Sequence, residues 1–113
     1  MKSYTDLEQS RKLAEILPIE SADMFYRGNG IDVKLMWEHN AQKVTNPCWS
    51  LAALLDVLPE GVIENYYAPN LQKENGKYSI AYCNEELLCI AIADNPIDAC
   101  YEMILKLNEQ KLL

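Results

Sequence analysis

Two apolar runs separated by three polar residues constrain this chain most strongly. KYSIAYC occupies residues 77–83 and LLCIAIA occupies 87–93, and both alternate large and small side chains with the two-residue period of a β-strand. A three-residue loop at 84–86 keeps the large residues on one face, whereas a slip by one residue mixes the two sets. The predicted pairs are Tyr82 with Leu88, Ile80 with Ile90 and Tyr78 with Ile92.

Both faces of this predicted hairpin are apolar, which is typical of strands that are covered on two sides. We therefore expect the hairpin to be central in its sheet. One cover is the helix that follows it. The other is either the rest of the chain or a second subunit, so a homodimer is an open alternative.

The helix after the hairpin has the clearest boundaries in the sequence. Asn95 is a favourable N-cap, Pro96 suits the first helical position, and Asp98 lies in the first turn, where a carboxylate interacts well with the helix dipole. Glu102 and Lys106 are spaced as an i, i+4 ion pair. The apolar residues at helical spacing are Ile97, Cys100, Tyr101, Ile104, Leu105 and Leu112.

A first helix is predicted near the N-terminus. Thr5 and Glu8 fit a capping box, in which a hydroxyl caps the helix and a carboxylate three residues later bonds back. The helix is expected over residues 6–17 and ends before Pro18. Its inner stripe is formed by Leu7, Leu13, Ala14, Ile16 and Leu17.

A short helix is predicted over residues 51–58 with Ser50 as its cap. In the alternative, Asn46 and Pro47 start the helix earlier. Trp49 is expected at the edge of the core, with its indole N–H bonded to a loop carbonyl. The apolar stripe of this helix consists of Leu51, Leu54, Leu55 and Leu58.

Two Asn-Gly pairs predict tight turns, because both residues tolerate positive φ. The first, at 29–30, gives a hairpin over 22–37. The second, at 75–76, pairs Glu74 with Lys77 and Leu71 with Ile80. Because proline cannot donate to a ladder, Pro69 places the strand before this turn at a sheet edge. The pairs expected in the first hairpin are Tyr26 with Val33, Met24 with Leu35, Ala22 with Trp37, and Arg27 with Asp32.

These elements predict a single α+β domain over residues 1–113. Its expected order is α-β-β-α-β-β-β-α, with three helices against a mainly antiparallel sheet of about five strands. A further short strand at Val62 and Ile63 is an open alternative.

Charge and hydropathy exclude several functions. The chain carries 10 basic and 17 acidic residues, a net charge of −7, and no Lys or Arg occurs in 44–72 or 78–105. A nucleic-acid surface needs clustered positive side chains, so no binding to nucleic acid is expected. A helix-turn-helix interpretation fails because its recognition segment, 62–67, carries Glu64 and no positive charge. No apolar run reaches membrane-spanning length and no secretory signal is recognisable, so we expect no membrane association and a cytoplasmic location.

Catalytic and metal chemistry have weak signals. The four cysteines, at 48, 83, 89 and 100, show no C-x-x-C spacing, and His39 is the single histidine, so neither a metal site nor a cofactor is expected. Cys48 lies near a predicted helix start, where a thiol pKa is lowered, and His39 would be its base. A small cysteine-dependent enzyme is therefore the alternative to a protein without catalysis.

Aromatic residues suggest a binding surface. Tyrosines are enriched at protein interfaces, but they are also good strand formers, so a purely structural role competes with this interpretation. The candidate binding residues are Tyr66, Tyr67, Tyr78, Tyr82 and Trp49.

The run WSLAALLDVLP at 49–59, followed by the strand YSI and a helix opening NPIDAC, resembles a group of small uncharacterised proteins from the genomes and prophages of gut anaerobes. The resemblance covers most of the chain from about residue 46 and the segment KLAEILP near the start. It implies an origin in a phage or other mobile element. That group has no assigned activity, so the resemblance implies no catalytic or binding residues.

The leading functional hypothesis is a non-catalytic acidic adaptor or regulator that binds an unidentified protein, with or without forming a homodimer. The cysteine-dependent enzyme is one alternative. A transcriptional regulator that acts through a DNA-binding partner is the other.

Overall fold

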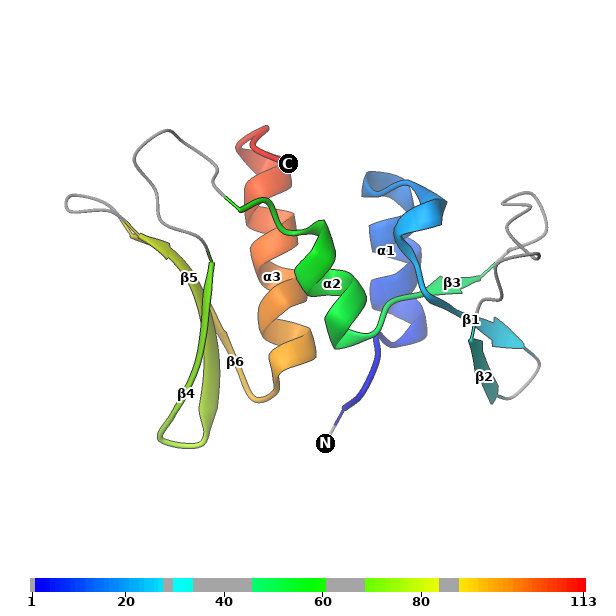
Figure 1. The fold of residues 1–113 in the computed structure, drawn as a ribbon, viewed down its shortest axis with the longest axis horizontal. Coiled ribbons are helices and arrows are strands. Elements are labelled where there is room, and N and C mark those ends of the chain that lie inside the picture. The colour runs from blue at the N-terminus through cyan, green and yellow to red at the C-terminus, as the bar shows by residue number, and fades with distance from the viewer. Residues whose placement is uncertain (1, 28–29, 34–45, 61–68, 84–87) are drawn as a thin grey trace.

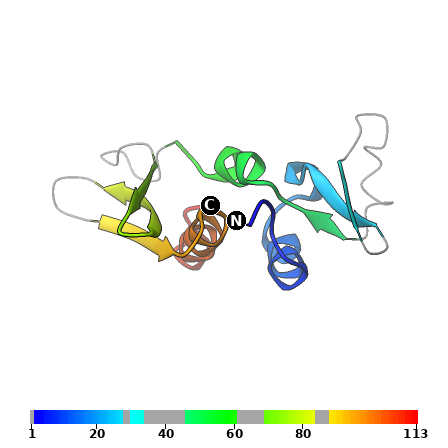
Figure 2. The ribbon, with the colours of Figure 1, turned by 90° about the horizontal axis from the view of Figure 1, so that it is seen from below.

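Three helices lie side by side between two small antiparallel sheets in the computed structural model, which measures 45 × 31 × 21 Å (Figure 1). The structure describes residues 2–27, 30–33, 46–60, 69–83 and 88–113. Helices α1 and α3 share one layer, with α2 on one side of both (Figure 2). The predicted α+β class is confirmed, but a short strand before α2, at Pro47–Cys48, is an addition to the predicted element order, and the strands form two separate sheets with the helices between them.

The first sheet has the strand order β2-β1-β3, built from β1 (Met24–Arg27), β2 (Gly30–Val33) and β3 (Pro47–Cys48). Arg27 pairs with Gly30, so residues 28 and 29 join the strands. The predicted register is therefore wrong by two residues. The sequence Gly28-Asn29 tolerates positive φ as well as Asn29-Gly30 does, so turn chemistry does not distinguish the two positions. A register shift of two residues also leaves each side chain on the same face of the sheet. The observed pairs are Tyr26 with Ile31, Met24 with Val33, and Phe25 with Asp32; Leu35 and Trp37 lie outside the described residues.

Helix α1 (Leu7–Ile16) begins one residue later than predicted, with Asp6 as its N-cap. The Asp6 carboxylate accepts the Gln9 N–H at 2.8 Å, and the Gln9 side chain accepts the Asp6 N–H at 3.1 Å. The capping box is thus Asp6 with Gln9, because Thr5 is engaged elsewhere. A short 3-10 helix, η1 (Ile19–Ser21), follows. The predicted stripe is partly wrong: Ser10, Leu13 and Leu17 are buried, whereas Leu7 and Ala14 are exposed.

Helix α2 (Leu51–Val57) is capped by Ser50, as predicted, and does not start earlier. The Ser50 hydroxyl oxygen accepts the Ala53 N–H at 3.2 Å. Leu54 and Leu58 are buried, but Leu55 is 38% exposed, contrary to prediction. Just before this helix, Trp49 is fully buried, and its indole N–H donates to Ser21 Oγ at 3.0 Å rather than to a carbonyl.

The second sheet has the order β4-β5-β6, with β4 (Asn70–Glu74), β5 (Lys77–Cys83) and β6 (Leu88–Ala93). Its first turn is confirmed: Asn75 and Gly76 have φ values of 52° and 76°, and Glu74 pairs with Lys77. The predicted edge position of β4 is also confirmed. Residues Val62 and Ile63 lie outside the described part of the chain.

The register between β5 and β6 differs from the prediction by one residue, because four residues rather than three connect the strands. The observed pairs are Tyr82 with Cys89, Ile80 with Ala91, and Tyr78 with Ala93. Ile80 and Tyr82 face α3 together with the small residues of β6. Ile90 and Ile92 face the opposite side, where Ile92 is 60% exposed. The predicted central position is therefore wrong for β6, and the described part of the chain leaves Ile92 exposed; cover by a second subunit stays a prediction.

Helix α3 (Pro96–Glu109) has the predicted cap, since the Asn95 side-chain oxygen accepts the Asp98 N–H at 2.8 Å. Lys106 donates to the Ile90 carbonyl at 2.5 Å rather than forming the expected pair with Glu102. Tyr101 and Leu105 are half-buried. The buried apolar stripe of α3 consists of Ile97, Ala99, Cys100, Met103, Ile104 and Leu107.

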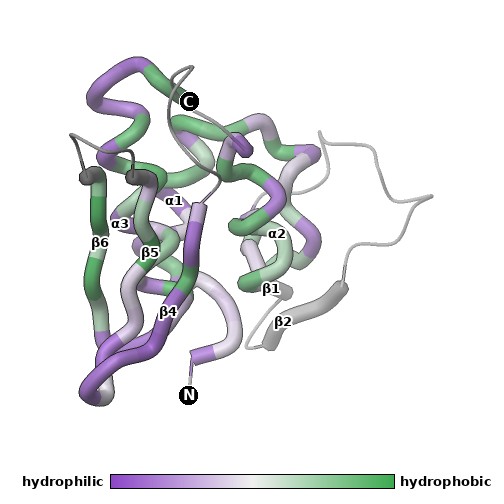
Figure 3. Tube along the Cα trace, turned by 60° about the vertical axis from the view of Figure 1, so that its left-hand side comes forward, coloured by the Kyte–Doolittle hydropathy of each residue, from purple (hydrophilic) through white to green (hydrophobic). Residues whose placement is uncertain are grey.

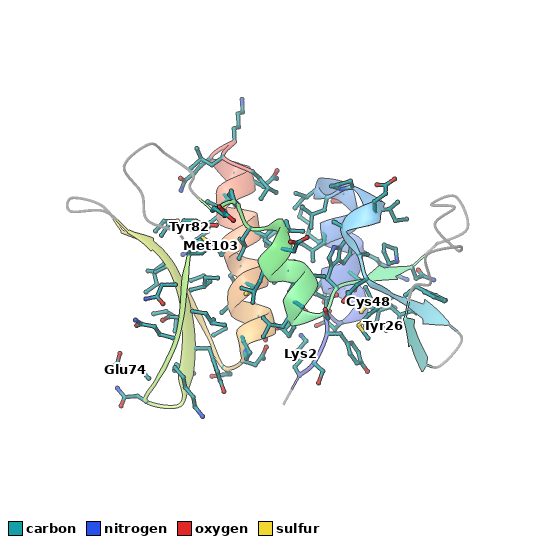
Figure 4. The ribbon with its side chains drawn as sticks, viewed as in Figure 1. Lys2, Tyr26, Cys48, Glu74, Tyr82 and Met103 are labelled. Atoms are coloured by element: carbon teal, nitrogen blue, oxygen red, sulfur yellow. The ribbon has the colours of Figure 1, made fainter. Side chains whose placement is uncertain are left out.

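One apolar core runs from α1 through α2 and α3 to the second sheet. Trp49 and Tyr82 are its largest fully buried side chains, and Figure 4 shows Tyr82 on the side of the sheet that faces Met103 of α3. None of the helices in the described part of the chain combines the length and apolarity that a membrane crossing needs.

The two isoleucines of the hairpin provide a test of the register. Ile80 is fully buried and Ile92 is mostly exposed. We expect Ile80→Ala to lower the free energy of unfolding by about 2–5 kcal/mol through cavity formation. Ile92→Ala should change it by less than about 0.5 kcal/mol. Urea unfolding of both variants measures the difference, and equal losses would contradict the observed register.

Candidate functional site

The predicted aromatic surface is not formed by the residues that the structure describes. Trp49 and Tyr82 are fully buried in the core, and the Tyr82 hydroxyl donates to the Pro59 carbonyl at 2.5 Å. Burial raises the pKa of Tyr82, so the phenol stays protonated. Tyr78 is half-buried, with Lys73 Nζ 5.5 Å from its ring centroid. Tyr66 and Tyr67 lie outside the described residues.

Cys48 lies in a buried network of hydroxyl groups near the start of α1 (Figure 4). The thiol donates to the Thr5 carbonyl at 3.4 Å and accepts from the Thr5 hydroxyl at 3.7 Å. Tyr26 also donates to the Thr5 carbonyl, at 2.6 Å, and Thr5 Oγ1 lies 2.8 Å from Ser10 Oγ. The network joins α1, β1 and β3 around Thr5.

Burial raises the pKa of the Cys48 thiol, although hydrogen bonds from Thr5, Ser10 and Tyr26 partly offset the effect. Burial likewise raises the pKa of Tyr26 to about 12. A nucleophilic cysteine needs an accessible thiolate with a lowered pKa, and the environment of Cys48 acts in the opposite direction on both counts. His39, the proposed base, lies outside the described residues.

Thr5 explains why Asp6 is the N-cap of α1. Its hydroxyl oxygen accepts the buried Trp49 N–H at 3.1 Å, and its own N–H donates to the Trp49 carbonyl at 3.0 Å. A capping box would use the hydroxyl and the N–H of Thr5, and both are engaged by Trp49, the residue after β3. Thr5 connects the N-terminal segment to the middle of the chain.

Replacement of Thr5 by valine keeps the shape but removes the hydroxyl. The buried Trp49 N–H then loses its acceptor, so we expect the free energy of unfolding to fall by about 1–3 kcal/mol. Thr5→Ser is the matched control, because it keeps the hydroxyl and loses one methyl group, at a cost of about 1 kcal/mol or less. Equal losses in urea unfolding would show that the hydroxyl does not matter.

A second polar cluster surrounds Asp98 in the first turn of α3. One Asp98 oxygen accepts from Lys2 Nζ and from Gln9 Nε2, each at 2.8 Å, and the other accepts from Asn95 Nδ2 at 2.9 Å. Lys2 also pairs with Asp6 at 3.0 Å. Burial acts to raise the pKa of Asp98, but these hydrogen bonds outweigh it and hold that pKa below its usual value. The cluster ties the N-terminal segment and α1 to α3.

The depressed pKa of Asp98 makes its contribution to stability dependent on pH. A carboxyl group whose pKa is lower when folded stabilises the protein above its unfolded pKa, about 3.9, and loses this effect as the pH falls through the folded value. We expect Asp98→Asn to be less stable than the wild type at neutral pH, and the difference to shrink below about pH 4. Urea unfolding across this range measures it. In a Lys2→Met background, Asp98→Asn should lower the free energy of unfolding at neutral pH by a smaller amount. An unchanged loss would contradict a stabilising ion pair between Lys2 and Asp98.

The described residues form no metal-binding site. Within those residues, no three His, Cys, Asp or Glu side chains are grouped closely enough to hold a metal ion. Cys48 and Cys100 are buried and Cys89 is half-buried. Burial raises the pKa of Cys100 to about 11, so this thiol also stays protonated.

The free edge of β6 is the most distinctive surface of the described residues. Figure 3 shows β6 as a hydrophobic strand at the outer side of the sheet, whereas β4, at the other edge, is mostly hydrophilic. The six residues of β6 carry no charge, and Ile92 exposes 60% of its surface. Lys106 occupies the Ile90 carbonyl. By contrast, β4 follows Pro69 and carries Lys73 and Glu74, which discourage strand pairing.

A groove of about 450 Å³ lies beside the second half of β6. Its lining includes Ile92 and Ala93 of β6, Glu102 and Lys106 of α3, and Gln9 of α1. Lys77 and Asp94, which also line it, form an ion pair with each other. The groove therefore lies where β6, α1 and α3 meet.

The candidate surface, Ile90 and Ile92, was not among the residues selected from the sequence. The available signal was the run LLCIAIA, which is apolar on both faces. The three-residue loop assigned to the hairpin placed both isoleucines in the core. A second cover was expected for the opposite face, so the exposed strand was overlooked.

No protein-family model, curated protein or solved structure matches this chain. The resemblance to proteins of gut anaerobes and their prophages therefore stays a prediction, as does the mobile-element origin that it implies.

Proposed function

We propose that this protein is a non-catalytic interaction module that binds a protein partner along β6. The observation that carries the proposal is the uncharged, apolar strand with a free edge and an exposed Ile92. An extended segment that pairs with such an edge gains main-chain hydrogen bonds and apolar side-chain contacts together. The partner contributes a strand, and the groove beside β6 accommodates its inward side chains.

The two edges of the second sheet support this choice. Proteins usually protect a free strand edge with charges, proline or a covering segment, because an open edge pairs with other chains. The β4 edge has the first two forms of protection, in Lys73, Glu74 and Pro69. Among the described residues, β6 has one such device, the contact of Lys106 with the Ile90 carbonyl. An edge kept this open is consistent with selection for binding.

The net charge of −7 fits a protein partner better than a nucleic acid, because phosphates would be repelled by the carboxylates. A regulator acting through a DNA-binding partner remains a special case of the proposal. No observation favours catalysis by Cys48, whose thiol is buried and protonated.

The proposal is tested with a charge introduced on the strand. We expect immobilised Ile92→Lys protein to retain at least tenfold less partner from a lysate of the encoding cells, because burying an unpaired ammonium costs more than about 1.4 kcal/mol. Leu55→Lys is the matched control. It changes another exposed apolar residue, 38% exposed and located on α2 rather than on the second sheet, and should retain the partner as the wild type does. Quantitative mass spectrometry measures retention.

Equal retention by the wild type and Ile92→Lys would refute the proposal, provided that circular dichroism shows both folded. Loss of the same proteins by Leu55→Lys would also refute it, because the effect would then come from added charge rather than from β6.

A further inference from the structure

We infer that the strand that pairs with β6 is β6 of a second copy of this chain, related to the first by a twofold axis at Ile90. The inference rests on the proposed function of β6 as a binding edge and names the partner at that same site. The result is an antiparallel pair of β6 strands at the centre of a continuous six-stranded sheet.

The position of the axis follows from the backbone. The Ile90 carbonyl points toward the free edge, since Lys106 of α3 reaches it there. In a strand beside an antiparallel neighbour, alternate residues direct their N–H and C=O groups to the same side. Leu88, Ile90 and Ile92 therefore present their main-chain groups to an incoming strand. A twofold axis at Ile90 pairs Ile90 with its own copy and Leu88 with Ile92 of the second copy.

This pairing is self-complementary in size. Ile90 meets its own copy on the outer face, where aliphatic cross-strand pairs stabilise a sheet. On the inner face, Cys89 meets Ala91 of the second copy, and these small side chains fit beneath the α3 helices. The exposed Ile92 gains an apolar neighbour on a strand of its own length and pattern.

Charge favours the same arrangement. The chain has a net charge of −7, so most surfaces of two copies repel each other. Residues 87–93 carry no charge, and Asp94, which follows them, is paired with Lys77. Self-pairing of β6 therefore brings no charged side chain of β6 itself against another; Asp98, Glu102 and Lys106 of α3 line the groove beside it.

Dimer formation replaces the contact between Lys106 and the Ile90 carbonyl with a main-chain bond from the second copy. The released ammonium has Glu102, one turn earlier on α3 and beside the same groove, as its new partner. Lys106 thus competes with the second copy for one acceptor. Lys106→Met should strengthen the dimer by about threefold or more, the effect of one hydrogen bond.

The first test is the mass of the purified full chain by light scattering over a range of concentrations. We expect the wild type and Leu55→Lys to be dimers and Ile92→Lys to be a monomer. Lys106→Met should lower the dissociation constant, and Lys12→Met, on the exposed side of α1, should not. A wild type that stays monomeric up to about 1 mM, a concentration at which even weak specific pairs form, would overturn the inference.

The second test locates the axis. In a background with Cys83→Ser and Cys89→Ser, Ile90→Cys should be joined to its copy by a short bis-maleimide. Ser79→Cys lies on the outer face of the central strand β5 and should not be cross-linked. The two β6 strands separate the two copies of β5, which therefore lie about 14 Å apart. Equal cross-linking at both positions would overturn the twofold pairing of β6.

The outcomes separate the two proposals. A wild type that is monomeric but captures a different protein, with capture lost in Ile92→Lys, overturns the second-copy inference and leaves the proposed function intact. A dimer that persists in Ile92→Lys overturns the inference, and the lysate experiment then decides the proposed function independently.

Discussion

The short connection between β6 and α3 is the constraint on which the rest of the second half depends. Only Asp94 and Asn95 separate the strand from the helix, so α3 returns directly along β6 and lies close against it. Small residues, Cys89, Ala91 and Ala93, must then face the helix, while the larger Ile80 and Tyr82 of the neighbouring strand fill the space beside it. The isoleucines of β6 have no place in this core and face outward.

Local chemistry predicted the elements that depend on neighbouring residues. The Asn95 cap, the turn at Asn75 and the Ser50 cap are each determined by side chains within a few positions, and each was recovered from the sequence. The β6 register was not, because it depends on a loop length and on how closely a later helix packs. The cap of α1 also required distant information: Asp6 and Thr5 are both good caps, and Trp49 decides between them by engaging Thr5.

The candidate site also depends on packing between distant segments rather than on the types of its residues. Residue types selected for chemistry or recognition, such as Cys48, Trp49 and Tyr82, are in the core, where their polar atoms are satisfied by nearby hydroxyl and carbonyl groups. The surface that carries the proposal consists of ordinary aliphatic residues. Aliphatic side chains indicate function only through their exposure, and exposure follows from the register rather than from the residue type.

The cluster around Asp98 joins residues 96 positions apart, because Lys2 reaches across to the first turn of the last helix. During synthesis, the helix that receives this lysine leaves the ribosome after the other helices and strands described above. The contact between Thr5 and Trp49 joins residues 44 positions apart, so it can close before α3 has been synthesised. A nascent chain that stalls before Asp98 therefore leaves Lys2 with Asp6 as its acidic partner and the core beside α2 uncovered.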